Sequence, residues 1–456
     1  MNMRRIINIF LAVFFLTACE KKLDLSPTQS ISQENALLTE GDVKVTLIGA
    51  YDGLQSVRLY GGDIQVVNEL LGNTDNILFT GTFAGLADIH ALEITTQNTF
   101  ARDTWIQAYN TINRVNNVLS ALDKVTSSPE ERDRIEGEAL FIRSALYFEL
   151  VKLFAKTWGD GDNNANPGVP LILTPTAGIS ESDYVSRNSV AQVYAKVIED
   201  LTRAESLLPT SNTIYASKGA AAAMLSRIAL MQGDYAAARD AANRVITSGE
   251  YSLEGNFENL WYLYMNNGGA NPAEYIFSMT VTQQDGGNSM NTYFGISIGV
   301  PGTGGRGDCK ILGAHINKYE EGDVRGEFFA QVGANFYTQK HLDIFGNVPV
   351  VRLAEMYLTR AEANLRLGTS VGDAPLDDVN LIRDRAGLDP LPAVTLQNIL
   401  NERFLELAFE GQALSDAKRT RSNWSGNAWN SELLILPIPQ REIDVNSNLV
   451  QNEAYD

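Results

Sequence analysis

A cluster of charged side chains near the C-terminal end of the chain could support acid–base chemistry. Glu402, Arg403, Glu406 and Glu410 lie close together in the sequence, and a pair of carboxylates can act as general acid and general base on one substrate. The spacing of four residues, however, places such side chains on one face of a helix, where opposite charges form salt bridges. We therefore interpret the cluster as helix salt bridges, and the sequence predicts no catalytic residue.

Two glycine-rich motifs have the form of catalytic or cofactor loops. Gly295-Ile-Ser297-Ile-Gly299 matches the nucleophile elbow of esterases, and the run from Gly302 to Gly307 matches a dinucleotide-binding loop. Both motifs need a strand that turns into a helix, and no such pattern surrounds them. We interpret both as chance matches in a glycine-rich loop.

The histidines and cysteines do not form a recognisable metal site. His90, His315 and His341 are far apart, and none has the spacing of a zinc ligand. There are two cysteines, and if Cys19 carries lipid, as argued next, Cys309 has no partner for a disulfide within the mature chain. The sequence therefore predicts no metal.

The first residues of the chain have the pattern of an export signal. Arg4 and Arg5 precede an apolar run from Ile6 to Leu16, which is shorter than the roughly 20 apolar residues of a membrane-spanning helix. Leu16-Thr17-Ala18-Cys19 resembles a bacterial lipobox, in which the signal is cut before the cysteine and the cysteine is lipidated. We predict a lipoprotein signal peptide over residues 1–18, a covalent lipid on Cys19 and no other cofactor. The alternative is an ordinary cleaved signal followed by a coincidental cysteine.

The composition limits the partners of the mature chain. The formal net charge is −19, and removal of residues 1–18, which contain Arg4 and Arg5 and no acidic residue, gives −21. Such a surface repels nucleic acid and anionic lipid headgroups. No apolar run after the signal is long enough to cross a membrane, so we expect a soluble body on a lipidated tether over residues 19–30.

Helical periodicity dominates most of the remaining chain. Apolar residues recur at intervals of three and four, which is typical of amphipathic helices. The expected helices span residues 32–55, 104–122, 129–153, 190–208, 219–232, 236–246, 350–367, 376–386 and 395–410. The alanine-rich pair around Gly233, Asp234 and Tyr235 resembles a tetratricopeptide repeat, although any tight antiparallel helix pair would have a similar pattern.

Two regions interrupt the helices. Residues 60–101 are rich in Gly, Asn, Thr and Asp, and we expect long loops there. Residues 250–345 are rich in Gly, Asn and aromatic residues, and we expect loops with short strands and brief helices. A long irregular region inside a helical scaffold is usually functional.

Short segments over nearly the whole mature chain match one family pattern in order. They are Cys19 with Leu23 to Pro27; Trp105 to Asn113 with Asn116; Glu136 to Phe148; Gly168 to Leu171; Lys218 to Ala221; Arg352 to Leu358 with Ala361 to Ala363; Asn380 to Gly387; Asn401 to Gly411; and Leu436 to Pro439 leading to Asn446, Gln451 and Asn452. This ordered set resembles the SusD/RagB-like family of outer-membrane glycan-binding lipoproteins of Bacteroidota. One departure follows Gly411, where the family usually has an Arg or His and then an aromatic residue before an Asp, and this chain has Gln412 to Asp416.

The resemblance implies the fold, the partners and the location. The fold would be mainly α, with a tetratricopeptide-like helix-pair scaffold and a loop-rich irregular part that binds the ligand. Residues 31–456 would form a single SusD-like domain with a loop-rich insertion around 250–345. The partners would be an oligosaccharide and a SusC-like TonB-dependent outer-membrane barrel, and the lipid on Cys19 would hold the protein at the outer membrane, on the cell surface.

Sugar recognition needs exposed aromatic rings for the C–H faces of the sugar, and amides or carboxylates for its hydroxyls. The resemblance places such residues on early and middle loops. The candidates are Trp261, Tyr262, Tyr264, Asn266, Tyr293 and Phe294 in the middle region, and Asp75, Asn76, Phe79 and Phe83 in the early one. Each aromatic residue could instead be part of the core.

We therefore predict a surface lipoprotein that binds glycan, delivers it to a TonB-dependent transporter for nutrient uptake and performs no chemistry. Two alternatives belong to other classes. One is a surface glycoside hydrolase that uses two carboxylates. The other is an assembly adaptor, or a peptide-binding lipoprotein, without a sugar site.

Overall fold

The computed structural model describes residues 37–456, apart from Thr74, Ala177, Ile179, Tyr264, Asn266, Asn267, Trp424 and Ser425. The predicted signal peptide, the lipid on Cys19 and the tether therefore lie outside the described residues. Within that part of the chain, no helix has the length and apolar character needed to cross a membrane.

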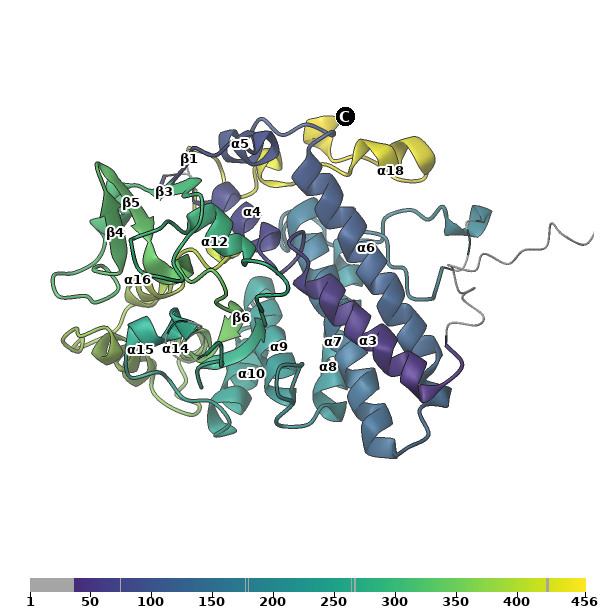
Figure 1. Cartoon of the computed structure of the whole chain (residues 1–456), viewed down its shortest axis with the longest axis horizontal. Coiled ribbons are helices and arrows are strands. Elements are labelled where there is room, and N and C mark those ends of the chain that lie inside the picture. Colours follow the sequence, from purple (N-terminus) through teal and green to yellow (C-terminus); the bar gives the residue numbers. More distant parts are fainter. Residues whose placement is uncertain are drawn as a thin grey trace, which may run out of the picture.

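Helices form most of the structure, and short strands lie between them (Figure 1). The helices are α3 Glu40–Gln55, α4 Asp63–Gly72, α5 Ala84–Ala91, α6 Thr99–Ser120, α7 Pro129–Phe154, α8 Val190–Leu207, α9 Lys218–Gln232, α10 Tyr235–Thr247, α12 Ser289–Phe294, α13 Gly313–Ile316, α14 Leu353–Leu367, α15 Pro375–Arg385, α16 Leu396–Glu406, α17 Ala413–Thr420 and α18 Gln440–Val445. The strands are β1 Ile77–Phe79, β2 Tyr275–Met279, β3 Cys309–Ile311, β4 Phe329–Val332, β5 Asn335–Thr338 and β6 Val348–Arg352.

The helical scaffold is a row of helices that pack on their neighbours in sequence. Helix α6 packs on α3 and α7, α7 on α8, α8 on α9, α9 on α10, and α10 on α14. This order, visible in Figure 1 as long helices side by side, confirms the predicted mainly α fold with tetratricopeptide-like helix pairs. Helix α7 is its centre, since nearly all of its residues from Ile135 to Phe154 are buried.

Local sequence signals set the ends of these helices. The hydroxyl of Ser128 accepts a hydrogen bond from the backbone N–H of Glu131 at 3.2 Å, and Pro129 occupies the first turn of α7. Gly233 ends α9 with a φ of 74°, which an L side chain adopts only with strain. The carboxylate of Asp234 then caps α10 by accepting from the N–H of Ala237 at 3.0 Å, so the predicted helix pair is present.

The prediction of long loops over residues 60–101 is wrong. Helices α4 and α5 and strand β1 lie in this stretch. Every residue of α4 is buried, including its polar residues Asp63, Gln65, Asn68 and Glu69. Polar residues of this kind suggested exposed loops, but here they form hydrogen bonds inside the protein. Strand β6, which precedes α14, and helix α17, which follows Gly411, were also not predicted.

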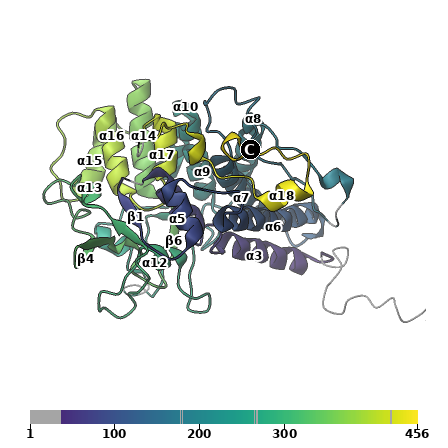
Figure 2. The same cartoon turned by 90° about the horizontal axis from the view of Figure 1, so that it is seen from above.

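The strands form two small sheets beside the helices. One sheet has the order β1-β3-β5-β4, and the other pairs β2 with β6. Strand β1 comes from the early region, whereas β3, β4 and β5 come from the middle region, and β1 pairs antiparallel with β3. Figure 2 shows that this part of the chain lies at one end of the molecule, away from α3 and α18. The expected mixture of loops, short strands and brief helices over 250–345 is present.

Buried ion pairs join the loop-rich region to the C-terminal helices. The guanidinium of Arg352, which is 1% exposed, binds Glu274 at 2.8 Å, Glu410 at 2.8 Å and also Glu406. Burial alone would raise the pKa of Glu406, but Arg385, Arg352 and other cations outweigh this effect and hold its pKa well below the usual range. We call the connected set the buried ion network; its members are Glu274, Asp323, Arg325, Lys340, Arg352, Arg385, Glu402, Glu406 and Glu410.

This network corrects the interpretation of the charged cluster at 402–410. Glu402, Glu406 and Glu410 pair with cations from other elements and not with neighbours on their own helix. Arg403 likewise binds Glu355 of α14 and Asp416 of α17. The spacing predicted salt bridges within the helix, because sequence separation alone cannot indicate that other elements cover its charged face and supply the cations.

Candidate functional site

The early and middle regions meet where β1 pairs with β3. Ile77 lies opposite Ile311, Leu78 opposite Lys310 and Phe79 opposite Cys309. The backbone N–H of Thr80 donates to the carbonyl of Asp308 at 2.7 Å, and the N–H of Leu312 donates to the carbonyl of Asn76 at 2.9 Å. The chain that follows each strand is therefore held at a fixed position beside the other. We call the area formed by residues 78–83 and 306–310 the loop surface; its exposed residues are Leu78, Thr80, Thr82 and Arg306.

Arg306 is the central side chain of the loop surface. Its guanidinium lies 4.5 Å from the centre of the Phe83 ring, and its Nη2 donates to the hydroxyl of Thr82 at 2.6 Å. Its Nε lies 3.2 Å from Oδ2 of Asp308. The side chain of Arg306 is nevertheless 42% exposed, so a planar, fixed group with remaining N–H donors faces solvent.

Asp308 provides a carboxylate at the same place. Burial raises the pKa of Asp308, and Arg306 opposes this rise. Gly81 passes very close to this side chain, because a Cβ atom at position 81 would lie 2.5 Å from Cγ of Asp308. Only glycine allows that approach, so Gly81 is part of what positions the carboxylate.

The layer beneath the loop surface is also polar and ordered. The hydroxyl of Tyr293 donates to Oδ1 of Asp63 at 2.5 Å, and Arg58 binds Oδ2 of Asp63 at 2.9 Å. Burial and the carboxylate of Asp63 together raise the pKa of Tyr293. The rings of Tyr293 and Phe83 meet edge to face with centroids 5.8 Å apart, so Tyr293 supports Phe83 from below.

The four predicted ligand residues of the middle region that the structure describes are buried, which corrects the expectation that they are exposed on loops. Trp261, Tyr262, Tyr293 and Phe294 are all in the core. Lys340 lies 4.9 Å from the Trp261 ring, and Phe294 packs against Phe409 and His341. Other side chains of the protein cover these rings, so a sugar cannot stack on them.

Tyr262 contacts two residues that line a hollow at the surface, although it does not line the hollow itself. Its hydroxyl donates to Oε1 of Gln339 at 2.7 Å, and its ring packs against Phe328. Gln339 and Phe328 line a hollow of about 550 Å³, together with Phe257, Glu258 and Glu327. Tyr262 therefore orients a residue of this hollow without lining it.

The early candidates divide between core and surface. Asn76 and Phe79 are buried, and the amide of Asn76 donates to Oδ1 of Asn73 at 2.6 Å. Asp75 is exposed, and Phe83 is partly exposed beneath Arg306. Tyr264 and Asn266 lie outside the described residues, as does Cys19. Among the predicted ligand residues that the structure describes, Phe79 and Phe83 fall within the loop surface, and Phe83, unlike the buried Phe79, is partly exposed beneath Arg306.

Thr80, Thr82, Arg306 and Asp308 are not among the residues predicted from the sequence. Arg306 lay inside the glycine-rich run that we dismissed as a chance dinucleotide loop, and the run between Gly295 and Gly307 contains no strand-to-helix turn. A charged residue flanked by glycines, Gly305-Arg306-Gly307-Asp308, was the available signal. Glycines on both sides of a charged residue allow the backbone to turn tightly, which can place that side chain at the surface.

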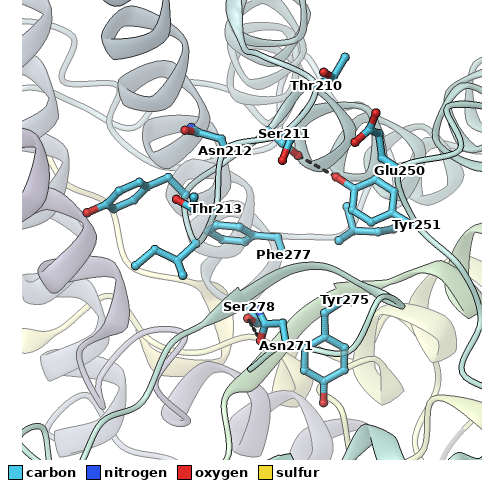
Figure 3. Close-up of a pocket in the computed structure, with 14 residues that line it drawn as sticks. Thr210, Ser211, Asn212, Thr213, Glu250, Tyr251, Asn271, Tyr275, Phe277 and Ser278 are labelled. Carbon is cyan, nitrogen blue, oxygen red and sulfur yellow. Dashed lines mark hydrogen bonds between the residues drawn. The ribbon is translucent and has the colours of Figure 1, made fainter. Parts of the chain in front are cut away.

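One further cavity lies in the helical scaffold (Figure 3). It is formed by the connection between α8 and α9 together with β2, and has a volume of about 90 Å³. Tyr251 and Ser217 share a hydrogen bond of 2.8 Å at its edge. A water occupies roughly 30 Å³ in the liquid, so this space suits a few waters and is too small for a sugar ring.

The geometry defines a helical-repeat protein whose exposed polar surface is carried by two loops. Two family models match successive parts of the chain. A SusD-like model described as "Starch-binding associating with outer membrane" matches residues 23–230, and the model of the SusD family matches residues 329–432.

Individual relatives extend this result over the whole chain. SusD-like protein P2 of Formosa agariphila is 24% identical, and the alignment covers 98% of each chain. A SusD superfamily crystal structure from Bacteroides thetaiotaomicron has a TM-score of 0.79 and 24% identity, covering 91% of this chain and 100% of that one. A laminarin-binding SusD-like protein has a TM-score of 0.74 and 25% identity, with coverages of 91% and 100%. The chain belongs to the SusD/RagB-like family.

Proposed function

We propose that this protein binds an oligosaccharide at the loop surface and passes it to a TonB-dependent outer-membrane transporter. The observation that carries the proposal is the position of Arg306, fixed by Phe83, Thr82 and Asp308 and still exposed. Family membership supports it, since the matching model is described as starch-binding and one structural neighbour binds laminarin.

The chemistry of the loop surface suits sugar hydroxyls. The guanidinium of Arg306 donates in a fixed plane, and the hydroxyls of Thr80 and Thr82 can both donate and accept. The carboxylate of Asp308 is buried, so it orients Arg306 and does not face the ligand. The donors and acceptors are already oriented by their contacts with each other, so little conformational entropy is lost when a ligand binds. Asp75 and Phe83, from the early set, lie in or next to this area of the chain.

The same proposal covers location and partners. A lipid on Cys19 would hold the protein at the outer membrane, facing outward, beside a SusC-like barrel. The description of the matching family model names the outer membrane. No catalysis, cofactor, metal or nucleic acid takes part in the proposed activity, and the mature charge of −21 is unfavourable for nucleic acid binding.

Calorimetric titration with laminarin, starch oligosaccharides and a wider glycan panel tests binding. Arg306→Ala should weaken the affinity for a bound glycan by roughly tenfold to a hundredfold, because charge-assisted hydrogen bonds are lost. Arg132→Ala is the matched control, since Arg132 is exposed on α7. Equal affinities for Arg306→Ala and wild type would refute the loop surface as the site.

Transporter delivery and the absence of catalysis need separate measurements. A tagged pull-down from native outer membranes should recover a TonB-dependent barrel in near-equal amount, and Cys19→Ala should release the protein from the membrane fraction. Recovery of no barrel under a detergent that preserves such complexes would refute delivery. Release of products from any bound glycan would instead favour the glycoside hydrolase.

A further inference from the structure

A groove lies between α6 and α18, away from the loop surface. Figures 1 and 2 both place α18 beside α6 at one end of the molecule and the sheet β1-β3-β5-β4 at the other. The groove has a volume of about 450 Å³, which is within the usual range for small-molecule sites. We call it the scaffold groove. The residues that line it include Ile106, Tyr109, Asn110, Asp183, Arg441 and Glu442.

The walls of the scaffold groove are fixed by hydrogen bonds between segments far apart in sequence. The hydroxyl of Tyr109 donates to the carbonyl of Pro170 at 2.8 Å. The amide of Asn116 donates to the carbonyl of Ile172 at 2.9 Å, and the amide of Asn446 donates to the carbonyl of Val185 at 2.9 Å. The loop over residues 170–185 is thus tied both to α6 and to the C-terminal segment. A groove held in this way exists before any ligand arrives.

Polar groups in the groove remain available after these bonds are made. Asn110 is exposed, and its amide has no hydrogen bond within the described part of the chain. Arg441 lies 3.2 Å from Glu442 and is 64% exposed. Oδ2 of Asp183 accepts from the backbone and hydroxyl of Ser180, each at 2.7 Å, while the side chain stays exposed. The groove therefore offers an amide, a guanidinium and two carboxylates.

Apolar surface lies among these polar groups. Ile106 and the ring of Tyr109 are partly exposed on α6, and Leu449 lines the groove from the C-terminal segment. A sugar matches this lining, because it has hydroxyl groups on its edges for the polar side chains and C–H groups on its faces for the apolar ones. Phosphate and sulfate groups match poorly, because the carboxylates of Asp183 and Glu442 outnumber the one guanidinium.

We propose that the scaffold groove is a second saccharide-binding site, independent of the loop surface, for a neutral oligosaccharide. The proposal goes beyond the proposed function, since that function needs only one site. Two sites at opposite ends of one chain can hold a polysaccharide at two points. The second contact is then intramolecular, which raises the overall affinity without any new interaction at the loop surface.

Saturation-transfer NMR with neutral gluco-, galacto-, manno- and xylo-oligosaccharides tests the proposal. The protein is the full mature chain carrying Arg306→Ala, so that the loop surface is disabled. At least one oligosaccharide should still receive saturation, and adding Asn110→Ala and Glu442→Ala should reduce its affinity by about tenfold or more. The matched control adds Asn259→Ala and Glu321→Ala, which alter exposed residues of the same types elsewhere.

The outcomes separate the two proposals. Binding that survives Arg306→Ala and is lost only with the groove changes supports the scaffold groove, whatever happens at the loop surface. Binding that disappears with Arg306→Ala alone supports the loop surface and overturns the groove. Absence of saturation for every oligosaccharide, or equal loss in the control variant, also overturns it. Unchanged melting temperatures ensure that each comparison is made between folded proteins.

Discussion

The helical scaffold and the loop-rich region use different interactions to hold their shape. In the scaffold, α7 and its neighbours bury continuous apolar faces, with residues such as Ile142 and Leu146 fully inaccessible to solvent. In the loop-rich region, the backbone between β2 and β6 is irregular. Arg325 of the buried ion network ties it to Glu402 and Glu406 of α16, and Lys340 ties it to Glu410. Periodic apolar faces stabilise the scaffold, whereas individual buried ion pairs stabilise the loop-rich region.

This difference has a physical reason. Apolar contacts are non-directional, so a helix needs only a stripe of suitable residues to pack. A loop has no repeating stripe, and a charged side chain can be buried only where its partner has the right geometry. Each ion pair therefore fixes one position of the loop. We infer that the network sets where the loop surface lies relative to the scaffold.

The largest effect should follow removal of the central cation. Arg352→Met leaves Glu274, Glu406 and Glu410 buried without their shared partner, which should lower the free energy of unfolding by roughly 3–5 kcal/mol. Urea denaturation measures this loss, and hydrogen exchange should show that residues 309–352 lose protection before α7 does. Arg132→Met on the exposed face of α7 is the control. A loss as small as that of the control would mean that the network does not hold the loops.

A cavity in the scaffold should have a slightly smaller effect of a different kind. Leu146→Ala removes a fully buried side chain of α7, and such changes cost roughly 2–5 kcal/mol, about 3 in a typical site. Because no charge is involved, the loss should be independent of salt and pH. Denaturation at two salt concentrations checks this, and a salt-dependent loss would contradict the division between the two regions.

The free energy of unfolding should depend on pH through Glu69, which joins the early region to the C-terminal helices. Burial raises the pKa of Glu69 to about 7 from 4.5, although the N–H groups of Gly411 and Gln412 donate to its carboxylate at 2.7 and 3.1 Å. Between these pH values the folded chain binds more protons than the unfolded chain, so stability falls as the pH rises, and the penalty is constant above pH 7.

Glu69→Gln removes this titration and can keep an acceptor for the same N–H groups. Relative to wild type, the variant should gain roughly 2–3 kcal/mol between pH 4.5 and pH 7. Denaturation across that range measures the difference. Glu258→Gln changes an exposed glutamate, and its difference in stability from wild type should not vary with pH. If the difference for Glu69→Gln also does not vary with pH, Glu69 does not have the raised pKa.

The smallest effect concerns the cap of α9. The hydroxyl of Ser217 accepts from the N–H of Ala220 at 3.1 Å and also shares a hydrogen bond with the hydroxyl of Tyr251. Ser217→Ala should cost about 1 kcal/mol, as for other helix caps. Tyr251→Phe removes only the second bond and should cost less. The reverse order would mean that the cavity contact, and not the cap, stabilises this end of the scaffold.

The sequence predicted the scaffold better than the site. Helices α6, α7 and α8 have regular apolar stripes and clear caps, and their positions follow from those patterns. Helix α4 was missed because its polar residues, such as Asp63 and Glu69, suggested an exposed loop, whereas they are buried and paired inside the protein. The aromatic candidates failed for a related reason: Trp261 and Phe294 have the same residue types in a core as on a binding surface, and no periodicity in their region separates the two.

The amino-acid sequence by itself determined the class of fold, the family and the chemistry available to the loops, because helix periodicity and local motifs are properties of neighbouring residues. Tertiary structure alone decided which side chains reach solvent. Arg306 meets Thr82 and Phe83 from more than two hundred positions away in the chain, and Glu406 meets Arg352 inside the protein. Contacts of this kind depend on how the whole chain packs, since burial and pairing are set by elements that are remote in sequence.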